Sequence, residues 1–436
     1  MLKSVKIFML IILTAVLSCS FSIGAFAKGE KVDTSYRSVT EIHDWGAAIT
    51  KLIVKIGKPV PKQSITKDTF KVHVTRSDDR LLDSPLLEEG YREVTNAYVA
   101  DQNGNPAVRG KYVVLEMKIG PTVSLGSPLN YYSGSNKWIK SDYTITQEKD
   151  IKINAGKFGT ISGLVIDTFA GETREIVDSF SSGQATYKDV TLTYADYAPA
   201  KDKKKNPLII WLHGGGEGGT DPTIPLSANK ATSFATETIQ SYFNGAYVLV
   251  PQTPTRWMEG ISGGADGTSI YQEALMSLIK DYVANNPDID PNRIYIGGAS
   301  NGGYMTMLMV RDYPGYFAAA FPVCEGLNNN LVSDNDILNM SQTPIWFVHA
   351  KNDRTLPPGS NAIPTYNRLI DAGAENVHLT IFDNVQDNSG LYKNADGTPY
   401  EYNGHWSWIY VYNNEVETKI NDQTTTLMEW LAAQSR

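Results

Sequence analysis

A serine stands among small residues in the segment Gly298-Ala299-Ser300-Asn301-Gly302. A short apolar stretch from Arg293 precedes it, and a helical pattern begins near Asn301. A serine at such a strand-to-helix turn is held on a strained backbone with its hydroxyl pointing outward, and small neighbours let strand and helix approach closely. An ordinary glycine-rich turn is the alternative. The strand before and the helix after favour Ser300 as a nucleophile.

A serine hydroxyl is a weak nucleophile and needs a base within hydrogen-bond reach, itself oriented by a carboxylate. In parallel sheets, functional groups collect at the carboxyl ends of the strands. An apolar strand at 344–349 leads into a loop containing Asp353, and a later long loop contains His405. The order Ser300, Asp353, His405 is the order of an α/β-hydrolase.

Three other residues compete for these roles. His378 follows Asp353, but it lies inside an alternating strand, where a structural side chain is expected. His349 closes a core strand and precedes the acid. Asp383 stands at a strand end and is the alternative acid. The sequence favours Asp353 and His405.

A glycine-rich loop, residues 211–219 (Trp-Leu-His-Gly-Gly-Gly-Glu-Gly-Gly), follows directly after the first long apolar strand. Glycines let backbone N–H groups converge on a developing oxyanion, and the residue after the nucleophile, Asn301, supplies the second donor. We expect Gly215 to be the donor in this loop. Its neighbours Gly214 and Gly216 are the alternatives.

Two long, polar and aromatic segments, 253–270 and 384–403, follow strand ends, so both are expected to overhang the site. Trp257, Tyr304 and Trp406 are candidates for the wall of an acyl or aryl pocket, with core packing as the alternative for each. The sequence has no zinc motif of the His-Glu-x-x-His type, no P-loop and no dinucleotide fingerprint. We therefore expect no metal and no cofactor.

The elements that must position these residues begin at Pro207. Continuous apolar strands such as 208–212 and 246–250 alternate with helical patterns such as 271–283. This alternation indicates a mainly parallel sheet with helices on both faces. We expect an α/β-hydrolase catalytic domain at 207–436, preceded by a linker and first hairpin at 173–206.

The hydrophobic pattern of the front half differs from that of residues 207–436. Period-two alternation predicts strands at 50–56, 70–75 and 111–118, and no convincing amphipathic helix interrupts this region. An all-β immunoglobulin-like sandwich over residues 37–172 is the natural architecture, without the cysteine pair of antibody domains.

The amino terminus carries a targeting pattern. Two lysines precede an apolar run from Ile7 to Leu17, and small residues end in Ala25-Phe26-Ala27. This pattern predicts a secretory signal peptide at residues 1–27 and a secreted, extracellular protein. The apolar run is short for a membrane span, so no transmembrane segment is expected. Lipoprotein processing, which would leave a lipid anchor at Cys19, is the alternative.

The net charge of the chain argues against one class of binding partner. The chain has 39 Lys and Arg against 47 Asp and Glu, a formal net charge of −8, and removal of the two lysines in residues 1–27 leaves 37 against 47, or −10. A nucleic-acid partner is therefore not expected. After cleavage Cys324 would be the only cysteine, and inert packing is the favoured interpretation. Nothing in the sequence indicates the oligomeric state.

Taken together, the motifs resemble those of secreted carboxylesterases related to polyhydroxybutyrate depolymerases and feruloyl esterases. The front half is similar to the immunoglobulin-like domain that precedes the catalytic domain in one esterase branch. The resemblance implies a triad of Ser300, Asp353 and His405 and an ester substrate. One departure leaves the oxyanion donor open, because the glycine loop is richer in glycine than the usual His-Gly-x-Gly-Glu-x-Gly. The segments that carry the resemblance are 213–219, 251–252, 298–302, 352–353 and 404–406.

The leading hypothesis is a serine hydrolase that cleaves small or polymeric carboxylic esters through an acyl-enzyme. A serine peptidase of the prolyl-oligopeptidase type shares the triad order, although no propeller repeat is seen in the front half. A polyester or feruloyl polymer esterase would use the sandwich for substrate binding. A binding protein with an inert hydrolase fold is disfavoured, because all the residues of a triad are present.

Overall fold

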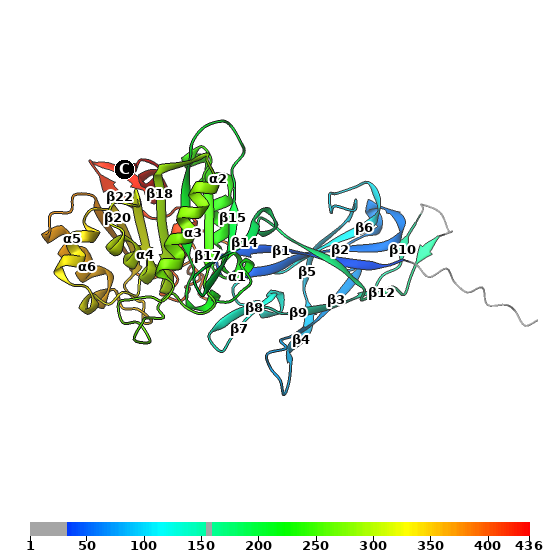
Figure 1. Cartoon of the computed structure of the whole chain (residues 1–436). Coiled ribbons are helices and arrows are strands. Elements are labelled where there is room, and N and C mark those ends of the chain that lie inside the picture. The colour runs from blue at the N-terminus through cyan, green and yellow to red at the C-terminus, as the bar shows by residue number, and fades with distance from the viewer. Residues whose placement is uncertain (1–32, 154–158) are drawn as a thin grey trace, which may run out of the picture.

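The chain forms two units that lie side by side in the computed structural model, a β-rich unit and an α/β unit (Figure 1). The structure describes residues 33–153 and 159–436. The predicted signal peptide, residues 1–27, and the alternative anchor Cys19 lie outside the described residues. Within the described ranges, no helix is both long and apolar enough to cross a membrane.

The β-rich unit, called the sandwich below, pairs a five-stranded sheet of order β13-β1-β2-β6-β5 with a four-stranded sheet of order β12-β9-β3-β4. Two short hairpins, β7-β8 and β10-β11, extend from it. The strands are β1 (Ser35–His43), β2 (Gly46–Pro61), β3 (Phe70–Ser77), β4 (Leu86–Arg92), β5 (Val94–Ala100), β6 (Arg109–Met117), β7 (Leu129–Tyr132), β8 (Ser135–Trp138), β9 (Lys140–Gln147), β10 (Ile151–Lys152), β11 (Thr160–Ile161), β12 (Val165–Ile166) and β13 (Phe169–Arg174).

Strand β3 shows why this sequence forms a two-layer sandwich. Phe70, Val72 and Val74 are buried, whereas the intervening Lys71 is exposed. The buried side chains pack in one core with side chains of the opposite sheet, such as Leu52. Alternating residues of a strand point to opposite faces, so one face meets the core and the other meets water.

The α/β unit is built on an eight-stranded sheet of order β14-β15-β17-β16-β18-β19-β20-β21. The hairpin β14-β15 and the β15-β17 pair are antiparallel, and the pairs from β17 to β21 are parallel. A separate hairpin, β22-β23, lies near the carboxyl end. The strands are β14 (Ser181–Tyr187), β15 (Val190–Tyr197), β16 (Asn206–Leu212), β17 (Tyr247–Gln252), β18 (Ile289–Ala299), β19 (Ala319–Val323), β20 (Ile345–Ala350), β21 (Val377–Phe382), β22 (Glu417–Ile420) and β23 (Gln423–Thr426).

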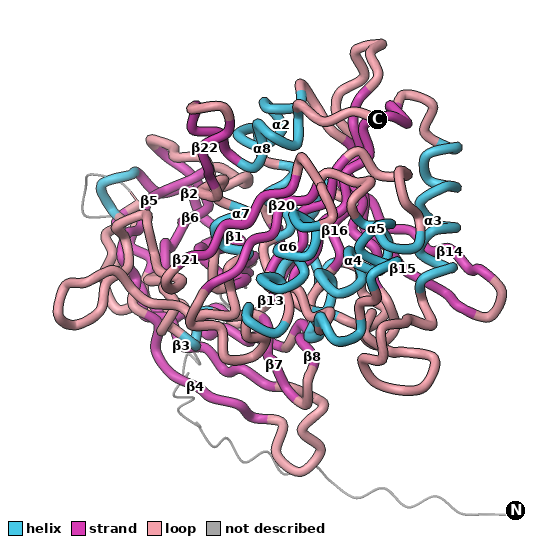
Figure 2. The backbone as a smooth tube through the Cα atoms, turned by 90° about the vertical axis from the view of Figure 1, so that its left-hand side faces the viewer, coloured by secondary structure: helices cyan, strands magenta, loops and turns pink. Residues whose placement is uncertain are grey.

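Helices cover both faces of this sheet, with α2 and α8 on one side of β16 and β20 and α4 and α6 on the other (Figure 2). The α-helices are α1 (Thr223–Ala228), α2 (Glu237–Phe243), α3 (Gln272–Asn285), α4 (Asn301–Asp312), α5 (Asp334–Met340), α6 (Ala362–Asp371), α7 (Trp408–Tyr412) and α8 (Leu427–Ala432). Short 3-10 turns are η1 (Lys62–Ser64), η2 (Ser124–Gly126), η3 (Val177–Ser179), η4 (Gly215–Glu217), η5 (Ala231–Ala235), η6 (Asn329–Leu331) and η7 (Pro358–Ser360).

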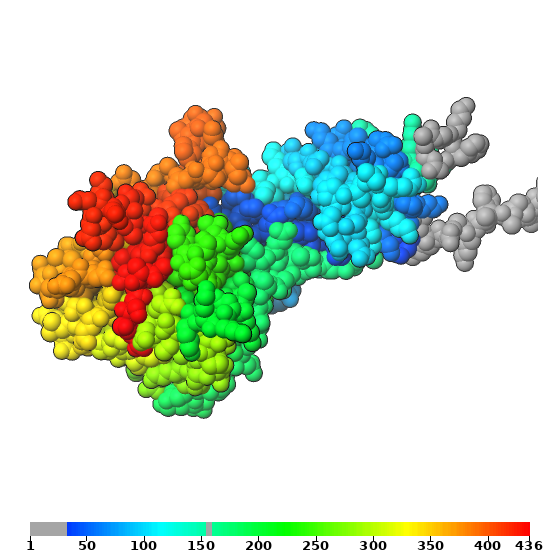
Figure 3. Space-filling view, turned by 90° about the horizontal axis from the view of Figure 1, so that it is seen from above, coloured from blue at the N-terminus to red at the C-terminus, as the bar shows by residue number. Residues whose placement is uncertain are grey.

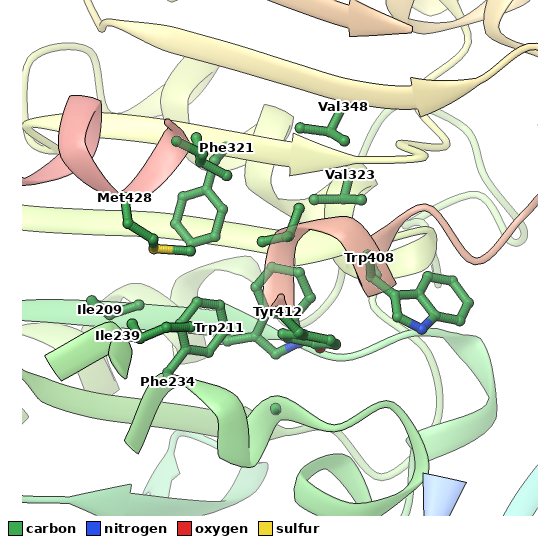
Figure 4. Packing of buried hydrophobic residues seen from close by; sticks show 14 of the residues in the cluster. Ile209, Trp211, Phe234, Ile239, Phe321, Val323, Val348, Trp408, Tyr412 and Met428 are labelled. Carbon is green, nitrogen blue, oxygen red and sulfur yellow. The ribbon is translucent and has the colours of Figure 1, made fainter. Parts of the chain in front are cut away.

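Strand β16 explains the continuous apolar runs of the sequence. All its residues are buried. Ile209 and Trp211 pack in the core on one face of the sheet, whereas Leu208, Ile210 and Leu212 pack in the core on the other face. Figure 4 shows the first of these cores around Trp211. A strand buried on both faces needs apolar side chains at every position, which period-two alternation would not supply.

The two units are joined by polar and apolar contacts. Lys230 Nζ pairs with Asp44 Oδ1 at 2.6 Å, and the indole N–H of Trp138 donates to Thr223 Oγ1 at 2.8 Å. An apolar cluster lies at the same junction, formed by Ala47, Leu129 and Ile224. The β1-β2 turn and the β7-β8 hairpin of the sandwich therefore dock onto the start of the α/β unit.

Candidate active site

Ser300 is the single residue between the end of β18 and the start of α4. Its backbone has φ 57° and ψ −114°, a conformation that residues other than glycine rarely adopt and that costs energy to hold. The N–H of Ser300 donates to the carbonyl of Val323 at 2.9 Å, which fixes the turn. The strained elbow expected from the sequence is present.

Glycines around Ser300 are required by close backbone approach. A Cβ added to Gly302 would lie 1.9 Å from the carbonyl oxygen of Leu212, and one added to Gly298 would lie 2.6 Å from the carbonyl of Gly302. Real Cβ atoms do not come this close to backbone atoms. Helix α4 can therefore start directly against β16 and β18 only because these positions have no side chain.

The side chains of Asp353 and His405 contact each other at the cavity that contains Ser300. His405 Nδ1 lies 2.8 Å from Asp353 Oδ2, and both residues are buried. The other carboxylate oxygen accepts from the backbone N–H groups of Thr355 and Leu356 at 2.8 and 2.9 Å. With Nδ1 donating to the carboxylate, Nε2 of His405 is the nitrogen left to accept a proton. Ser300 and His405 line the same cavity.

A second histidine holds the same carboxylate. His349 is fully buried, and its Nε2 lies 3.1 Å from Asp353 Oδ2 and 2.8 Å from the carbonyl of Leu356. Burial by itself would raise the pKa of Asp353, but the hydrogen bonds from His349 and His405 hold it well below its usual range. His349 does not line the cavity. His349 is therefore a hydrogen-bond partner of Asp353. The only sign of this role in the sequence is that His349 stands four residues before Asp353.

The other competitors lie elsewhere. His378 Nε2 contacts Asn376 Oδ1 at 3.1 Å, and its ring packs against both Trp346 and Trp430 in the α/β unit. Asp383 is exposed and pairs with a surface lysine, Lys351. Neither residue contacts the pair formed by Asp353 and His405.

The glycine loop continues from β16 into η4 and lines the same cavity as Ser300. A Cβ added to Gly215 would have Arg256 Cδ and Asn301 Cβ as neighbours, at 3.6 and 3.9 Å. Added carbons at Gly214 and Gly216 would instead meet Glu217 at 2.7 Å and Tyr131 at 3.0 Å. Of the three glycines, Gly215 is the one that faces Asn301.

Glu217 fixes this loop from inside. Its carboxylate oxygens accept from Asn136 Nδ2 at 2.9 Å and from Asn229 Nδ2 at 3.0 Å, and its carbonyl accepts from Gln252 at 2.8 Å. Burial raises the pKa of the Glu217 carboxyl to about 7, although the two amide hydrogen bonds act in the opposite direction. Asn136 belongs to the sandwich, so the two units hold the loop together.

The structure separates the three aromatic residues expected at the pocket. Trp406 lines the cavity. Trp257 and Tyr304 are completely buried in the core instead, with the ring of Trp257 against His213 and the hydroxyl of Tyr304 donating to the carbonyl of Thr268. A large aromatic side chain stabilises the folded state most when it is fully removed from water. The core provides this complete burial for Trp257 and Tyr304.

The cavity that contains Ser300 and His405 has a volume of about 630 Å³. Its wall includes Arg256 and Trp408, whose ring lies 5.6 Å from the ring of His405. The sandwich supplies much of the opposite wall. Sequence reasoning missed these sandwich residues, because strand patterns do not indicate how two units dock. They are Asp44, Trp45, Gly46, Ala47, Ser127, Leu129, Tyr131, Gly134 and Asn136.

Cys324 lies beside the acid and the base. Among the described residues, Cys324, Asp353 and His405 form the one group of three side chains whose ligand atoms could converge on a metal ion. Burial raises the pKa of the Cys324 thiol well above its usual value, so the sulfur stays protonated. Asp353 and His405 are already hydrogen-bonded to each other. The acid and the base of this group are therefore engaged with each other, and the buried thiol packs beside them.

Glu325 gives a pH dependence that can be measured. It is buried, one oxygen accepts from the N–H of Leu327 at 2.6 Å, and the other has no partner among the described residues. Burial raises its pKa from 4.5 to about 8. Because the pKa in the folded protein lies above the pKa in the unfolded chain, the free energy of unfolding falls as pH rises through this interval.

We expect Glu325→Gln to unfold at a higher temperature than the wild type at pH 9 and to show no such gain at pH 5. Thermal unfolding at both pH values measures this difference. Glu417→Gln, at an exposed position, is the matched control and should gain nothing at either pH. An equal gain for Glu325→Gln at both pH values would contradict the assigned ionisation.

Two family models match parts of the chain. Residues 35–160 match the model described as the esterase Ig-like N-terminal domain. Residues 272–336, which include Ser300, match the model of the prolyl oligopeptidase family. The matched ranges fall in the sandwich and in the α/β unit respectively.

The chain is also similar to curated proteins and to a solved structure. Poly(3-hydroxyalkanoate) depolymerase C of Paucimonas lemoignei is 31% identical over 139 residues, which are 30% of this chain and 30% of that protein. Feruloyl esterase B of Neurospora crassa is 31% identical over 130 residues, which are 28% of this chain and 40% of that protein. The matches thus span less than half the length of these relatives.

A crystal structure of a thermostable esterase covers almost the whole molecule. It has a TM-score of 0.74 and 25% identity, and the match covers 92% of this chain and 100% of that chain. The agreement over both units confirms the predicted fold class, an immunoglobulin-like sandwich in front of an α/β-hydrolase fold. The resemblance drawn from the sequence motifs is likewise confirmed.

Proposed function

We propose that this chain, an α/β-hydrolase with an esterase-type immunoglobulin-like domain in front, is a secreted serine carboxylesterase whose export is directed by residues 1–27. One observation carries the proposal. A histidine hydrogen-bonded to a buried carboxylate at 2.8 Å opens on the same cavity as a serine held on a strained elbow. Acyl transfer by a serine needs these three groups, a nucleophile, a base and an orienting acid, which supports the proposal.

Each residue has a distinct role in the proposed reaction. The hydroxyl of Ser300 attacks the ester carbonyl while Nε2 of His405 takes its proton. Asp353 holds the Nδ1–H of His405 and stabilises the imidazolium that forms. His405 then returns the proton to the leaving alcohol. A water molecule, activated by the same histidine, hydrolyses the acyl-enzyme.

The oxyanion is proposed to bind between Gly215 and Asn301. The N–H groups in the first turn of a helix have no partner within the helix, and Asn301 is the first residue of α4. A Cβ added to Gly215 would lie 3.9 Å from the Cβ of Asn301, whereas Asn301 is not among the nearest neighbours of Gly214 or Gly216, which supports Gly215 as the donor. Donors fixed in advance stabilise the charge that develops in the transition state.

A serine peptidase is the second candidate, because the prolyl oligopeptidase model matches residues 272–336. The front unit favours the esterase, since residues 35–160 match the esterase Ig-like domain. The names of the curated relatives also leave open a polymeric substrate, either a polyester or a feruloylated polymer.

Purified protein should hydrolyse p-nitrophenyl acyl esters from C2 to C12 and leave aminoacyl p-nitroanilides nearly untouched. The chain-length profile would report the size of the acyl site in the 630 Å³ cavity. Release of soluble products from an insoluble polyester, compared with p-nitrophenyl butyrate, would show whether polymers are also substrates. A clear preference for the anilides would overturn the esterase proposal in favour of the peptidase.

A further inference from the structure

A second cavity of about 460 Å³ lies between the sandwich and the segment 384–403. In Figure 3 this segment, coloured orange, projects beside the sandwich, which is coloured blue to cyan. The second cavity adjoins the one that contains Ser300, because the two have wall residues in common. The shared residues are Trp45, Ala47, Ser127, Asn403 and Trp406.

Trp45 stands at the junction of the two cavities. It lies in the turn between β1 and β2, where its ring stacks on His43 with centroids 4.7 Å apart and an angle of 6°. The ring of Tyr392, from the projecting segment, lies nearly perpendicular to it, with centroids 4.6 Å apart and an angle of 80°. The turn itself is anchored to the α/β unit, because Asp44 pairs with Lys230 at 2.6 Å. The indole is thus held in place from both units.

A row of aromatic rings leads from the second cavity to the base. Tyr400 and Tyr402 lie 5.1 Å apart, and Tyr402 stacks on Trp406 at 6.2 Å. Trp406 stacks in turn on Trp408 at 6.1 Å, and Trp408 lies 5.6 Å from His405. A substrate bound along this row would have its ester at His405 and its far end beside Tyr400.

The wall of the second cavity indicates what kind of group it takes. No Asp, Glu, Lys, Arg or His is among the described residues that line it. A charged group buried there would lose its hydration without gaining a partner, so the bound group is uncharged. The flat aromatic faces favour a ring, and three hydroxyl oxygens can accept hydrogen bonds from its substituents. These are Thr122, Ser124 and Ser127. Two of them, Ser124 and Ser127, donate their own protons to Glu88 Oε2 at 2.8 Å and to the Leu129 carbonyl at 3.0 Å.

We propose that this second cavity binds an uncharged, hydroxylated ring carried by the ester substrate, and that Trp45 is the residue that selects for it. The ring is an aryl group on the acyl side or a sugar on the alcohol side. This inference rests on the proposed esterase function and defines its substrate class. It makes the sandwich a part of the substrate site.

Three esters separate the alternatives when their hydrolysis is followed by titration of the released acid. Methyl butyrate carries no ring, methyl 4-hydroxycinnamate carries an aryl group, and an O-acetylated methyl xyloside carries a sugar. We expect Trp45→Ala to lower the ratio of kcat/KM for the preferred ring ester to that for methyl butyrate by about 10-fold, mainly through KM. Trp45→Phe should keep most of the ratio. Which ring ester responds identifies the ring.

Two controls accompany the Trp45→Ala measurement, an exposed aromatic residue and a test of folding. Tyr91→Ala replaces an exposed aromatic residue of the sandwich that lines neither cavity and should leave the ratio unchanged. Thermal unfolding shows whether Trp45→Ala is folded. If Trp45→Ala changes all three esters equally, or none of them, the proposal is wrong.

A binding measurement separates failure of the site from failure of the proposed function. Calorimetry with Ser300→Ala, and with Ser300→Ala combined with Trp45→Ala, measures affinity for the two ring esters without turnover. Binding that is lost with Trp45→Ala supports the site even if the wild type hydrolyses none of the esters. Hydrolysis of methyl butyrate with no binding of either ring ester would leave the esterase standing and overturn the second site.

Discussion

Ser300→Ala is expected to lower kcat/KM for p-nitrophenyl butyrate by on the order of a million-fold. The hydroxyl of Ser300 is the proposed attacking group, and no other residue stands at the elbow between β18 and α4. The backbone turn is held by the hydrogen bond from Ser300 N–H to Val323, which alanine keeps. Steady-state kinetics of the purified variant, with thermal unfolding to confirm its fold, provides the measurement.

Ser182→Ala is the matched control for this result. Ser182 is an exposed serine on the edge strand β14, so its variant should retain wild-type activity. A folded Ser300→Ala variant that keeps more than about 1% of the activity would show that Ser300 is not the nucleophile. Without its nucleophile, the site retains only the small rate that substrate binding and the oxyanion donors supply.

Asp353→Asn is expected to lower kcat/KM for the same ester by about 10⁴-fold. Asp353 Oδ2 accepts from His405 Nδ1 at 2.8 Å and from His349 Nε2 at 3.1 Å. An amide NH2 in place of that oxygen would favour the His405 tautomer that carries its proton on Nε2. That tautomer cannot take the proton of Ser300. Kinetics across pH 6 to 9 would show the loss at every pH.

The surface carboxylate Asp383 is the control for Asp353, because it was the alternative acid in the sequence and lies exposed beside Lys351. Asp383→Asn should behave as the wild type. An equal loss in both variants, or a loss in Asp383→Asn alone, would contradict the role proposed for Asp353.

The fold could be predicted from the sequence where burial leaves a direct pattern. The alternation in β3 and the unbroken apolar run in β16 follow from how many faces of each strand are covered. The pair Asp353 and His405 could be anticipated for a related reason. Loops at the carboxyl ends of parallel strands meet at one edge of the sheet, so chain order restricts which residues can approach Ser300.

The pocket wall could not be predicted in the same way. Arg256 and Trp257 are neighbours in one loop, yet the arginine lines the cavity and the tryptophan is completely buried. From residue type alone, the tryptophan would be expected to line the cavity. The direction of each side chain depends instead on how the loop runs in the folded protein, which the sequence pattern does not show. The same limit applies to Asn136, whose partner Glu217 lies in the other unit and is separated by 81 positions.

The sharing of one cavity by two units has an evolutionary consequence. The elbow tolerates little change, because Gly302 lies against the backbone of Leu212. The turn that carries Trp45 belongs to a separate unit outside the eight-stranded sheet. Mutations there can alter which molecules are accepted while leaving the reacting groups untouched. A lineage of such proteins can therefore diversify its substrates through one module and conserve its chemistry in the other.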